Sequence, residues 1–136
     1  MKKILVVDDE AKIRDLLTSY LSSIGYAVET ACSGSDLLLR NAAGYDLILL
    51  DVKMPGLSAY TSFKISSLDV AERSELPSKT YTPTIIVTGY PNDMETKLLL
   101  KDPAIMGIVQ KPFELDHLRA KIEDVLGREE PVPDPV

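Results

Sequence analysis

The sequence predicts an α/β fold, a three-layer sandwich in which a five-stranded parallel sheet lies between layers of five helices. Two observations lead to this prediction. Aliphatic runs such as Ile4-Leu5-Val6-Val7 and Leu47-Ile48-Leu49-Leu50 are continuous, as expected for strands that helices cover on both faces. Segments with apolar residues at helical spacing alternate with these runs, which is the pattern of repeated strand–helix units joined by right-handed crossovers.

The expected strands are short and rich in aliphatic side chains. They cover residues 4–7, 27–31, 47–50, 84–88 and 107–110.

Two helices are predicted in the first part of the chain. Apolar residues recur at helical spacing from Ile13 to Ile24, and Gly25 supplies the stop signal of this helix. A second, shorter helix follows Ser33, whose hydroxyl is a good N-cap.

Two further helices are predicted after the fourth strand. One covers Asn92 to Lys101, with Asn92 or Asp93 as its N-cap and Pro103 beyond its end. The other has an apolar stripe at helical spacing that consists of Leu115, Leu118, Ile122, Val125 and Leu126.

The segment from Ser58 to Thr82 is harder to interpret, because its apolar residues follow no single helical stripe. A third helix is expected within it, but Pro77 argues against one unbroken helix. Residues 1–126 are predicted to form one domain. Residues 127–136, which are rich in proline and acidic side chains, are predicted to form a flexible tail or the stub of a linker.

Composition narrows the classes of function. With a formal net charge of −6, the chain is not expected to bind nucleic acid by itself, because the phosphate backbone selects basic surfaces. No apolar stretch approaches the length that spans a membrane, and the first apolar run stops at Asp8, too early for a signal peptide. The single cysteine, Cys32, excludes an internal disulfide, indicates the cytoplasm, and is expected to be a small buried side chain.

Charged and hydroxyl side chains follow four of the predicted strands. Asp8-Asp9-Glu10 follows the first, Asp51 the third and Lys111 the fifth, while Thr88 closes the fourth. The carboxyl ends of parallel strands meet at one edge of the sheet, which is where open α/β sheets bind ligands. Carboxylates, an ammonium and a hydroxyl in one crevice suit a magnesium ion together with a phosphoryl group.

The order of these charged and hydroxyl residues, each at the end of a strand-like run, resembles that in the receiver domain of two-component response regulators. The resemblance extends from Lys2 to about Leu126 and includes Asp51 with the following Met54-Pro55-Gly56, and Lys111 with the following Pro112-Phe113. It implies a flavodoxin-like strand order, 2-1-3-4-5, and a cis peptide bond between Lys111 and Pro112.

The resemblance also assigns roles to the side chains at the sheet edge. Asp51 would be the phosphoacceptor. Magnesium, or manganese, would be held directly by Asp9, Asp51 and the backbone carbonyl of Lys53, with Asp8 acting mainly through bound water. Lys111 and the hydroxyl of Thr88 would bind the phosphoryl oxygens. Carboxylates that follow a strand are also common helix N-caps, and that alternative accounts for Glu10.

The implied function is phosphorelay signalling by a phosphoacceptor switch, not by an enzyme. The phosphoryl donor would be a sensor histidine kinase or a phosphotransfer protein that docks near the helix starting at about residue 11 and the loop after the fifth strand. The phosphorylated chain would change conformation and control a partner or an output domain. The resemblance leaves open a homodimer through the face of the helices at 92–101 and 115–126. The kinase, its signal and the output do not follow from the sequence, and the chain is either a stand-alone receiver or a fragment of a longer regulator.

Three positions affect two further properties that we expect of a receiver: the lifetime of the aspartyl phosphate and the coupling of the site to the rest of the domain. Lys53 and Tyr90 lie two residues after Asp51 and Thr88, where large side chains are expected to hinder the hydrolytic water and prolong the aspartyl phosphate. Ile108 lies three residues before Lys111, where related receivers carry an aromatic ring that moves on activation. A β-branched aliphatic side chain cannot make that movement, so the usual coupling is in doubt.

Two alternatives remain open from the sequence. A degenerate receiver would act only as a protein-interaction module. A phosphohydrolase of the haloacid dehalogenase type would also form an aspartyl phosphate, but that family places a second aspartate two residues after its nucleophile. Here the residue two after Asp8 is Glu10, and Asp51 would have no role.

Overall fold

A computed structural model describes residues 1–40, 42–65 and 82–127 of the chain. The described residues contain one wholly parallel, five-stranded sheet in the order β2-β1-β3-β4-β5. Its strands are β1 (Lys3–Val7), β2 (Ala27–Ala31), β3 (Leu47–Leu50), β4 (Thr84–Thr88) and β5 (Ile105–Gln110). The predicted flavodoxin-like strand order is therefore confirmed.

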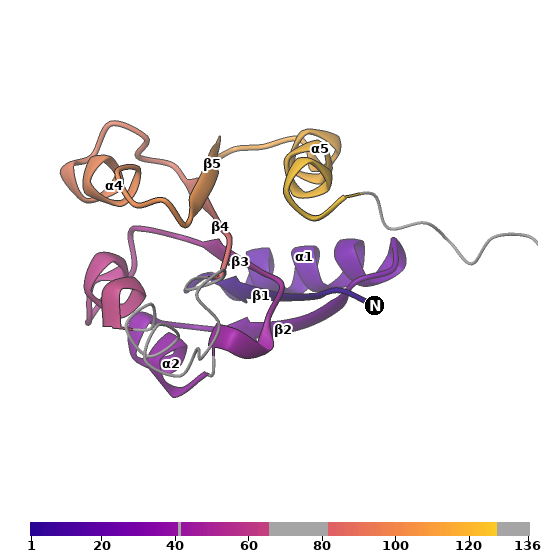
Figure 1. Ribbon diagram of the computed structural model, residues 1–136, viewed down its shortest axis with the longest axis horizontal. Coiled ribbons are helices and arrows are strands. Elements are labelled where there is room, and N and C mark those ends of the chain that lie inside the picture. The colour runs from indigo at the N-terminus through magenta and orange to yellow at the C-terminus, as the bar shows by residue number, and fades with distance from the viewer. Residues whose placement is uncertain (41, 66–81, 128–136) are drawn as a thin grey trace, which may run out of the picture.

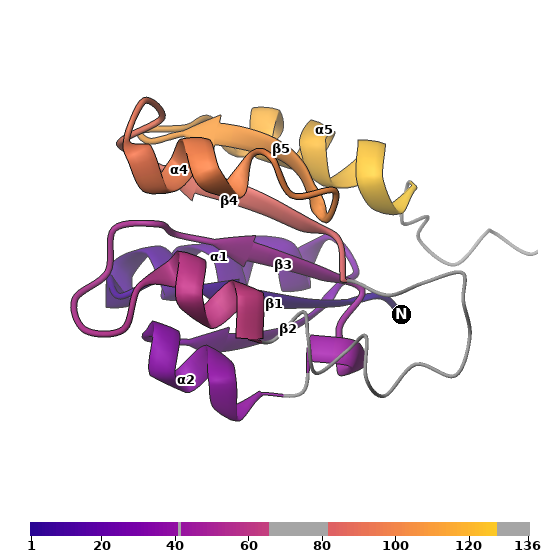
Figure 2. The same ribbon diagram turned by 60° about the vertical axis from the view of Figure 1, so that its left-hand side comes forward.

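Helices connect the strands as the sequence predicts. They are α1 (Ala11–Ser23), α2 (Gly34–Leu39), a helical segment over residues 59–65, α4 (Met94–Leu99) and α5 (Leu115–Leu126), with a short 3₁₀ helix at Ala42–Gly44. Figures 1 and 2 show α1 and α5 on one face of the sheet and α2 and α4 on the other. The predicted three-layer sandwich is confirmed.

Alternate side chains of each strand point to opposite faces and build two separate cores. Along β1, Leu5 and Val7 pack against the α2 and α4 side, whereas Ile4 and Val6 pack against α1 and α5. The central strand β3 is buried over its whole length. A strand that is buried on both faces must be aliphatic throughout, which is why the aliphatic runs predicted the strands well.

The helix termini follow the predicted signals in part. Ser33 caps α2, since its hydroxyl accepts a hydrogen bond of 3.0 Å from the backbone N–H of Asp36. Gly25 follows α1 with a φ of 107°, a left-handed conformation that favours glycine. Asp93, one of the two predicted caps, caps α4 by accepting a hydrogen bond from the N–H of Glu95. The helix therefore begins at Met94 and ends at Leu99, so the predicted range of Asn92 to Lys101 is too long.

Two other expectations need correction. The fifth strand begins at Ile105, two residues before the predicted start, because a register irregularity next to Met106 interrupts the alternation of side chains. Cys32 is exposed, not buried: it lies in the loop between β2 and α2, where its backbone N–H donates to Asp36 Oδ2.

The segment from Ser58 to Thr82 is only partly described. Residues 59–65 are helical, and Ala59, Ser62 and Phe63 are buried there, which confirms a third helix. Residues 66–81, including Pro77, and residues 128–136 of the predicted tail lie outside the described residues.

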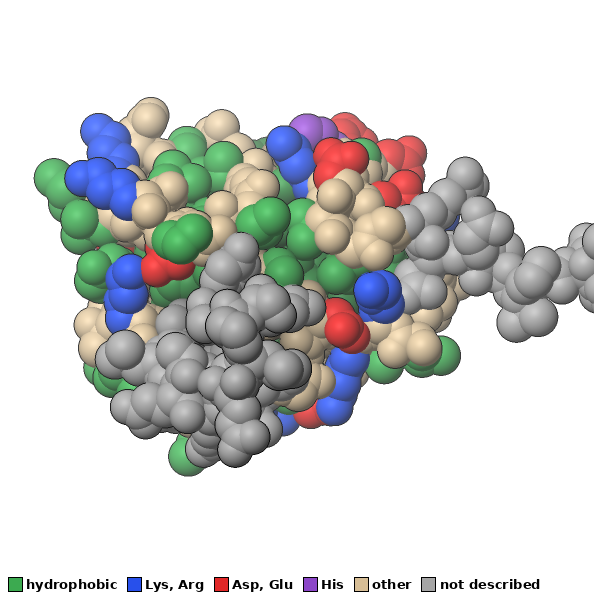
Figure 3. All heavy atoms as spheres, in the orientation of Figure 1, with side chains coloured by type: hydrophobic (Ala, Val, Ile, Leu, Met, Phe, Trp, Pro, Cys, Tyr) green, Lys and Arg blue, Asp and Glu red, His purple; other side chains and the backbone are tan. Residues whose placement is uncertain are grey.

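The acidic side chains are unevenly placed on the face of the molecule that Figure 3 presents. Figure 3 shows acidic side chains gathered over α5, beside the single histidine of the chain, His117, which is exposed as expected. Within the part of the chain that the structure describes, none of the helices combines the length and apolarity needed to cross a membrane.

The first turn of α2 packs closely against the 59–65 helix and the loop before it. A Cβ atom added at Gly34 would lie 2.5 Å from the backbone carbonyl oxygen of Leu57 and would also clash with the hydroxyl of Ser62. The backbone oxygen cannot move aside by a simple rotation, so only glycine allows this approach of the two helices.

We therefore expect Gly34→Ala to destabilise the protein by about 1–3 kcal/mol through overpacking. The matched control is Gly44→Ala, because a Cβ there meets nothing within 4 Å. That control should change the free energy of unfolding by less than about 1 kcal/mol. Urea denaturation of both variants measures the difference, and equal stabilities would contradict the close packing.

Candidate functional site

The parallel register brings the predicted side chains to one edge of the sheet. Val7 of β1 lies opposite Leu50 of β3, so the residues that follow them, Asp8 and Asp51, leave the sheet side by side. The backbone N–H of Asp51 donates to the carbonyl of Val7 at 2.9 Å. The structure thus places two carboxylates from distant parts of the sequence at the same edge.

The fourth and fifth strands supply the other two side chains. The backbone N–H of Lys111 donates to the carbonyl of Thr88 at 2.8 Å, which fixes Lys111 beside the end of β4. The peptide bond between Lys111 and Pro112 is cis, as the family resemblance implies. Thr88 is fully buried, and its hydroxyl oxygen accepts a hydrogen bond of 3.0 Å from the N–H of Tyr90.

The ammonium of Lys111 connects the carboxylates. Its Nζ atom lies 2.7 Å from Asp8 Oδ2, 3.6 Å from Asp51 Oδ2 and 3.7 Å from Glu10 Oε1. The side chains of Asp8 and Asp51 are only 3% and 6% exposed, so these contacts are poorly screened by water. One partly buried cation, 16% exposed, is therefore shared between the carboxylates that follow β1 and β3.

The loop after β1 is held by two further hydrogen bonds. The N–H of Glu10 donates to Asp8 Oδ1 at 2.9 Å, and a guanidinium N–H of Arg14 donates to the carbonyl oxygen of Asp8 at 2.8 Å. Arg14 was missed by the sequence interpretation, although a basic residue in the first turn of the helix after an acidic loop is a usable signal. These bonds fix the backbone that carries Asp8 and Asp9.

The acidic cluster has the composition of a site for a hard cation. One carboxylate oxygen from each of Asp8, Asp9 and Glu10 lies within 4.8 Å of the others. Glu10 occupies the N-cap position of α1 but its side chain makes no capping hydrogen bond, so the helix-cap alternative does not account for it. Oxygen ligands of this kind suit Mg²⁺, and the carboxylates present fit such an ion.

Burial and like charge make Asp51 reluctant to ionise without a metal. Burial, with the neighbouring Asp8 carboxylate, raises the pKa of Asp51 to about 7, although Lys111 and a hydrogen bond from the backbone N–H of Lys53 act in the opposite direction. Burial by itself would lower the pKa of Lys111, but the hydrogen bond to Asp8 and the charge of Asp51 outweigh it and raise that pKa. Lys111 therefore stays positively charged near neutral pH, whereas the neighbouring Asp51 carboxyl gains or loses its proton in that range.

A surface pocket of about 320 Å³ lies above these groups. It is lined by Glu10, Asp51, Lys53, Gly89, Tyr90 and Lys111. Because Asp51 and Lys111 reach the pocket while remaining mostly buried, a small anion placed there would meet the carboxylate and the ammonium together.

The two positions that the sequence interpretation linked to phosphate lifetime both line this pocket. The ammonium of Lys53 lies 5.7 Å from the centroid of the Tyr90 ring and 3.1 Å from Asp93 Oδ1. The ion pair with Asp93 was not predicted, since Asp93 was interpreted only as a helix cap. Its two partners lie in loops that follow different strands, and no local sequence pattern reports such a contact.

Ile108 lies on β5, partly buried against the core on the α2 and α4 side of the sheet. The pocket-lining residues do not include it. The structure therefore places this position in the apolar packing behind the site.

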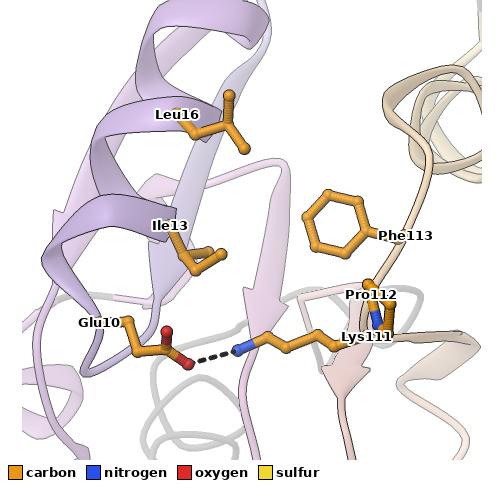
Figure 4. Close-up of a pocket in the computed structure, with 6 residues that line it drawn as sticks. All are labelled: Glu10, Ile13, Leu16, Lys111, Pro112 and Phe113. Carbon is orange, nitrogen blue, oxygen red and sulfur yellow. Dashed lines mark ion pairs between the residues drawn. The ribbon is translucent and has the colours of Figure 1, made fainter.

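A second pocket flanks the site between α1 and the loop after β5. Figure 4 shows Ile13 and Leu16 of α1 facing Phe113, with the ion pair between Glu10 and Lys111 at its base. Pro112 completes the lining. This groove is mainly apolar in its walls and has charged groups only at the end that adjoins the acidic cluster.

Comparison with known proteins agrees with this geometry. Residues 4–123 match the model of the response regulator receiver domain. A probable transcriptional regulator, ycf27 of Pyropia yezoensis, is 36% identical over 128 residues, which are 93% of this chain and 48% of the relative. The chain spans about half the length of the curated relatives it matches.

Solved structures show the same fold. The chemotaxis protein CheY4 of Vibrio cholerae is 30% identical, with a TM-score of 0.75 over 93% of this chain and 99% of the other. The response regulator TrrA of Thermotoga maritima, in complex with Mg²⁺ and BeF, is 33% identical, with a TM-score of 0.70 over 93% of this chain and 100% of the other. TrrA has also been solved in complex with the histidine kinase ThkA, and this chain matches it there with a TM-score of 0.68.

These matches exclude the phosphohydrolase alternative, because neither the matched family nor the structural relatives are of the haloacid dehalogenase type. The sheet order, the acidic residues after β1 and the lysine after β5 occur together in the matched region. The chain therefore belongs to the family of response regulator receiver domains, the signalling switches of phosphorelays.

Proposed function

We propose that this receiver domain accepts one phosphoryl group on Asp51 from a phosphohistidine of a sensor kinase or phosphotransfer protein, and then changes conformation to control a partner or an output domain. The observation that carries the proposal is the position of the Lys111 ammonium, 3.6 Å from Asp51 Oδ2 and 2.7 Å from Asp8 Oδ2 at one pocket. A positioned nucleophile with a cation beside it is what phosphoryl transfer requires.

Mg²⁺, or Mn²⁺, is the proposed cofactor. The proposed direct ligands are the carboxylates of Asp9 and Asp51 and the backbone carbonyl of Lys53. Asp8 would act through bound water, because one of its carboxylate oxygens already accepts from Lys111 and the other from Glu10 N–H. When bound, the ion would offset the negative charge of the carboxylates and of the incoming phosphoryl oxygens.

The proposed step moves the phosphoryl group from nitrogen to oxygen. A carboxylate oxygen of Asp51 forms a bond to phosphorus while the bond to the donor imidazole nitrogen breaks, and the released imidazole takes up a proton. Lys111 stays beside the phosphoryl oxygens, and the Thr88 hydroxyl, which accepts from Tyr90 N–H, can donate its own hydrogen to one of them. Asp51 attacks only as a carboxylate, and its raised pKa means that part of it is protonated near neutral pH. A nearby positive charge that favours the carboxylate should therefore favour the reaction.

The groove between α1 and the loop after β5 is the proposed docking site for the phosphoryl donor. Ile13, Leu16 and Phe113 offer an apolar surface at the margin of the site, and Leu16 is 44% exposed. The complex of TrrA with the kinase ThkA supports a partner of this kind for a receiver of this fold. A helical partner with an apolar face would bring its histidine next to Asp51.

Three further expectations remain part of the proposal. The acidic surface over α5 supports the absence of direct nucleic acid binding by this domain, so that any action on DNA would need another domain or partner (Figure 3). A homodimer through the face of α4 and α5 and a cytoplasmic location are also proposed. The chain is proposed to act as a switch that undergoes self-phosphorylation and self-dephosphorylation, without turning over an independent substrate.

The first test is phosphorylation by a small donor. Incubation with acetyl phosphate and magnesium should add one phosphoryl group, seen as a single adduct in the intact mass. Asp51→Asn should abolish the adduct, because an amide is not a nucleophile toward phosphorus. A modified Asp51→Asn protein, or labelling that persists in chelator, would contradict the proposal, and an unmodified parent would favour the degenerate receiver.

The second test concerns pH. The pKa of Asp51 is raised from 3.8 to about 7 in the metal-free fold. The folded state therefore binds this proton more tightly than the unfolded state does, so protonation of Asp51 stabilises the fold. That contribution is fully present below pH 3.8 and is lost as the pH rises through about 7. Without metal, the parent should therefore lose stability relative to Asp51→Asn between about pH 4 and about pH 8.

Thermal denaturation of both proteins in chelator measures this difference, and magnesium at the upper end of the pH range should reduce it by favouring the carboxylate. Parallel pH profiles for the parent and Asp51→Asn would show that Asp51 does not titrate in this way.

The third test concerns the lifetime of the aspartyl phosphate. Lys53 and Tyr90 line the pocket above Asp51 and should obstruct the in-line approach of water, so the combined change of Lys53→Asn and Tyr90→Ala should shorten the half-life severalfold. His117→Ala is the control, because His117 is exposed and does not line the pocket. Decay of the phosphorylated protein is followed by intact mass. A half-life that is unchanged or longer in the double variant counts against obstruction.

A further inference from the structure

The side chain of Lys53 links the pocket around Asp51 to the start of α4. Lys53 lines this pocket, yet its ammonium is paired with Asp93 Oδ1 at 3.1 Å, in the loop that precedes α4. The same ammonium lies 5.7 Å from the centroid of the Tyr90 ring, which also lines the pocket. The ammonium paired with Asp93 therefore also lies over the face of a ring that lines the pocket.

Asp93 uses its two carboxylate oxygens for different purposes. Oδ1 pairs with Lys53, while Oδ2 accepts a hydrogen bond of 3.1 Å from the N–H of Glu95 and so caps α4. The cation also holds the pKa of the Asp93 carboxyl below its usual range. One carboxylate thus joins the Lys53 ammonium to the first turn of α4.

The first turn of α4 is in turn joined to the neighbouring helix. Glu95 Oε1 accepts a hydrogen bond of 2.9 Å from the backbone N–H of Tyr60, in the first turn of the 59–65 helix. The hydroxyl of Thr96 donates to the carbonyl oxygen of Tyr90 at 3.1 Å. The loop that carries Asp93 is thus connected to two helices and to the wall of the pocket.

We propose that Lys53 is an exchangeable cation: a phosphoryl group on Asp51 attracts its ammonium away from Asp93, and this exchange passes the state of the pocket to the first turn of α4. The inference rests on the proposed phosphorylation of Asp51. It assigns to Lys53 and Asp93 a coupling role that is separate from the obstruction of water.

The charges favour such an exchange. Phosphorylation replaces one carboxylate charge at Asp51 with a group that carries nearly two negative charges and more acceptor oxygens. The pair that must be broken is weak, because the side chains of Lys53 and Asp93 are 48% and 27% exposed. Coupling of this kind is reciprocal, so removing the charge of Asp93 should strengthen anion binding at the pocket.

A double-mutant cycle on the full chain tests the proposal. The dissociation constant for beryllofluoride, a phosphoryl mimic, is measured with saturating magnesium for the parent, Lys53→Met, Asp93→Asn and the double variant. Asparagine is a good N-cap, so Asp93→Asn removes the charge while α4 remains capped. Methionine keeps most of the length of the lysine stem. The chemical shift of the Glu95 amide, recorded in the same titrations, reports on the cap of α4.

Asp93→Asn should bind beryllofluoride about two- to fivefold more tightly than the parent, the range expected for release of an exposed ion pair. Lys53→Met should bind more weakly, and adding Asp93→Asn to it should have no further effect. The Glu95 amide should shift on binding in the parent and much less in Lys53→Met. The matched control is the pair Lys64→Met and Asp102→Asn, an ion pair of 2.5 Å that does not line the pocket. It should leave the dissociation constant unchanged.

The other outcomes overturn the proposal in distinguishable ways. If Asp93→Asn tightens binding equally in the Lys53→Met background, the effect is a general loss of repulsion and not an exchange. If Asp93→Asn leaves the affinity of the parent unchanged, Lys53 does not leave Asp93. If the parent itself does not bind beryllofluoride, the proposed function fails, and the exchange fails with it.

Discussion

The shared cation at the edge of the sheet is the contact on which the site depends. Lys111 and Asp8 are 103 residues apart in sequence, and their 2.7 Å hydrogen bond forms only when β1, β3, β4 and β5 are all in register. Two carboxyl side chains buried at the same edge would otherwise repel each other. The lysine offsets part of that repulsion, while burial, together with the charge of Asp8, still raises the pKa of Asp51 to about 7. Under the proposed function, a cation bound at these carboxylates would offset their burial and like charge and so stabilise the folded domain.

The sequence predicted the strands well because their burial leaves little choice of side chain. The runs at 47–50 and 84–88 were located to the residue, since strands covered on both faces are continuous apolar segments with polar ends. Prediction was poorer where tertiary contacts decide the local structure. The start of α4 depends on which of two neighbouring polar residues caps it, and the start of β5 depends on a register irregularity. Cys32 is exposed because the chain has already left the sheet at that point.

The candidate site was predictable to the extent that each residue follows directly from the end of a strand. Asp8, Asp51, Thr88 and Lys111 met that condition, and the parallel register of the sheet brought them together. Arg14 and the pair of Lys53 with Asp93 did not. Their contacts depend on the shapes of loops after different strands, and a long cationic side chain reaches partners that sequence spacing does not indicate.

Because Ile108 packs against the core, the signal route that we propose runs through those loops. Ile108 packs in the core behind the site, and a β-branched side chain is restricted about χ1, so this position cannot exchange a ring between buried and exposed states. Among the described residues, polar contacts instead join the pocket to α4 through Tyr90, Asp93 and Thr96. These contacts are partly exposed and individually weak, so a change of charge at Asp51 can alter them without disturbing the two apolar cores. The stability of this domain therefore resides in the buried sheet, whereas the switching that we propose would act through the charged loops at the carboxyl edge of that sheet.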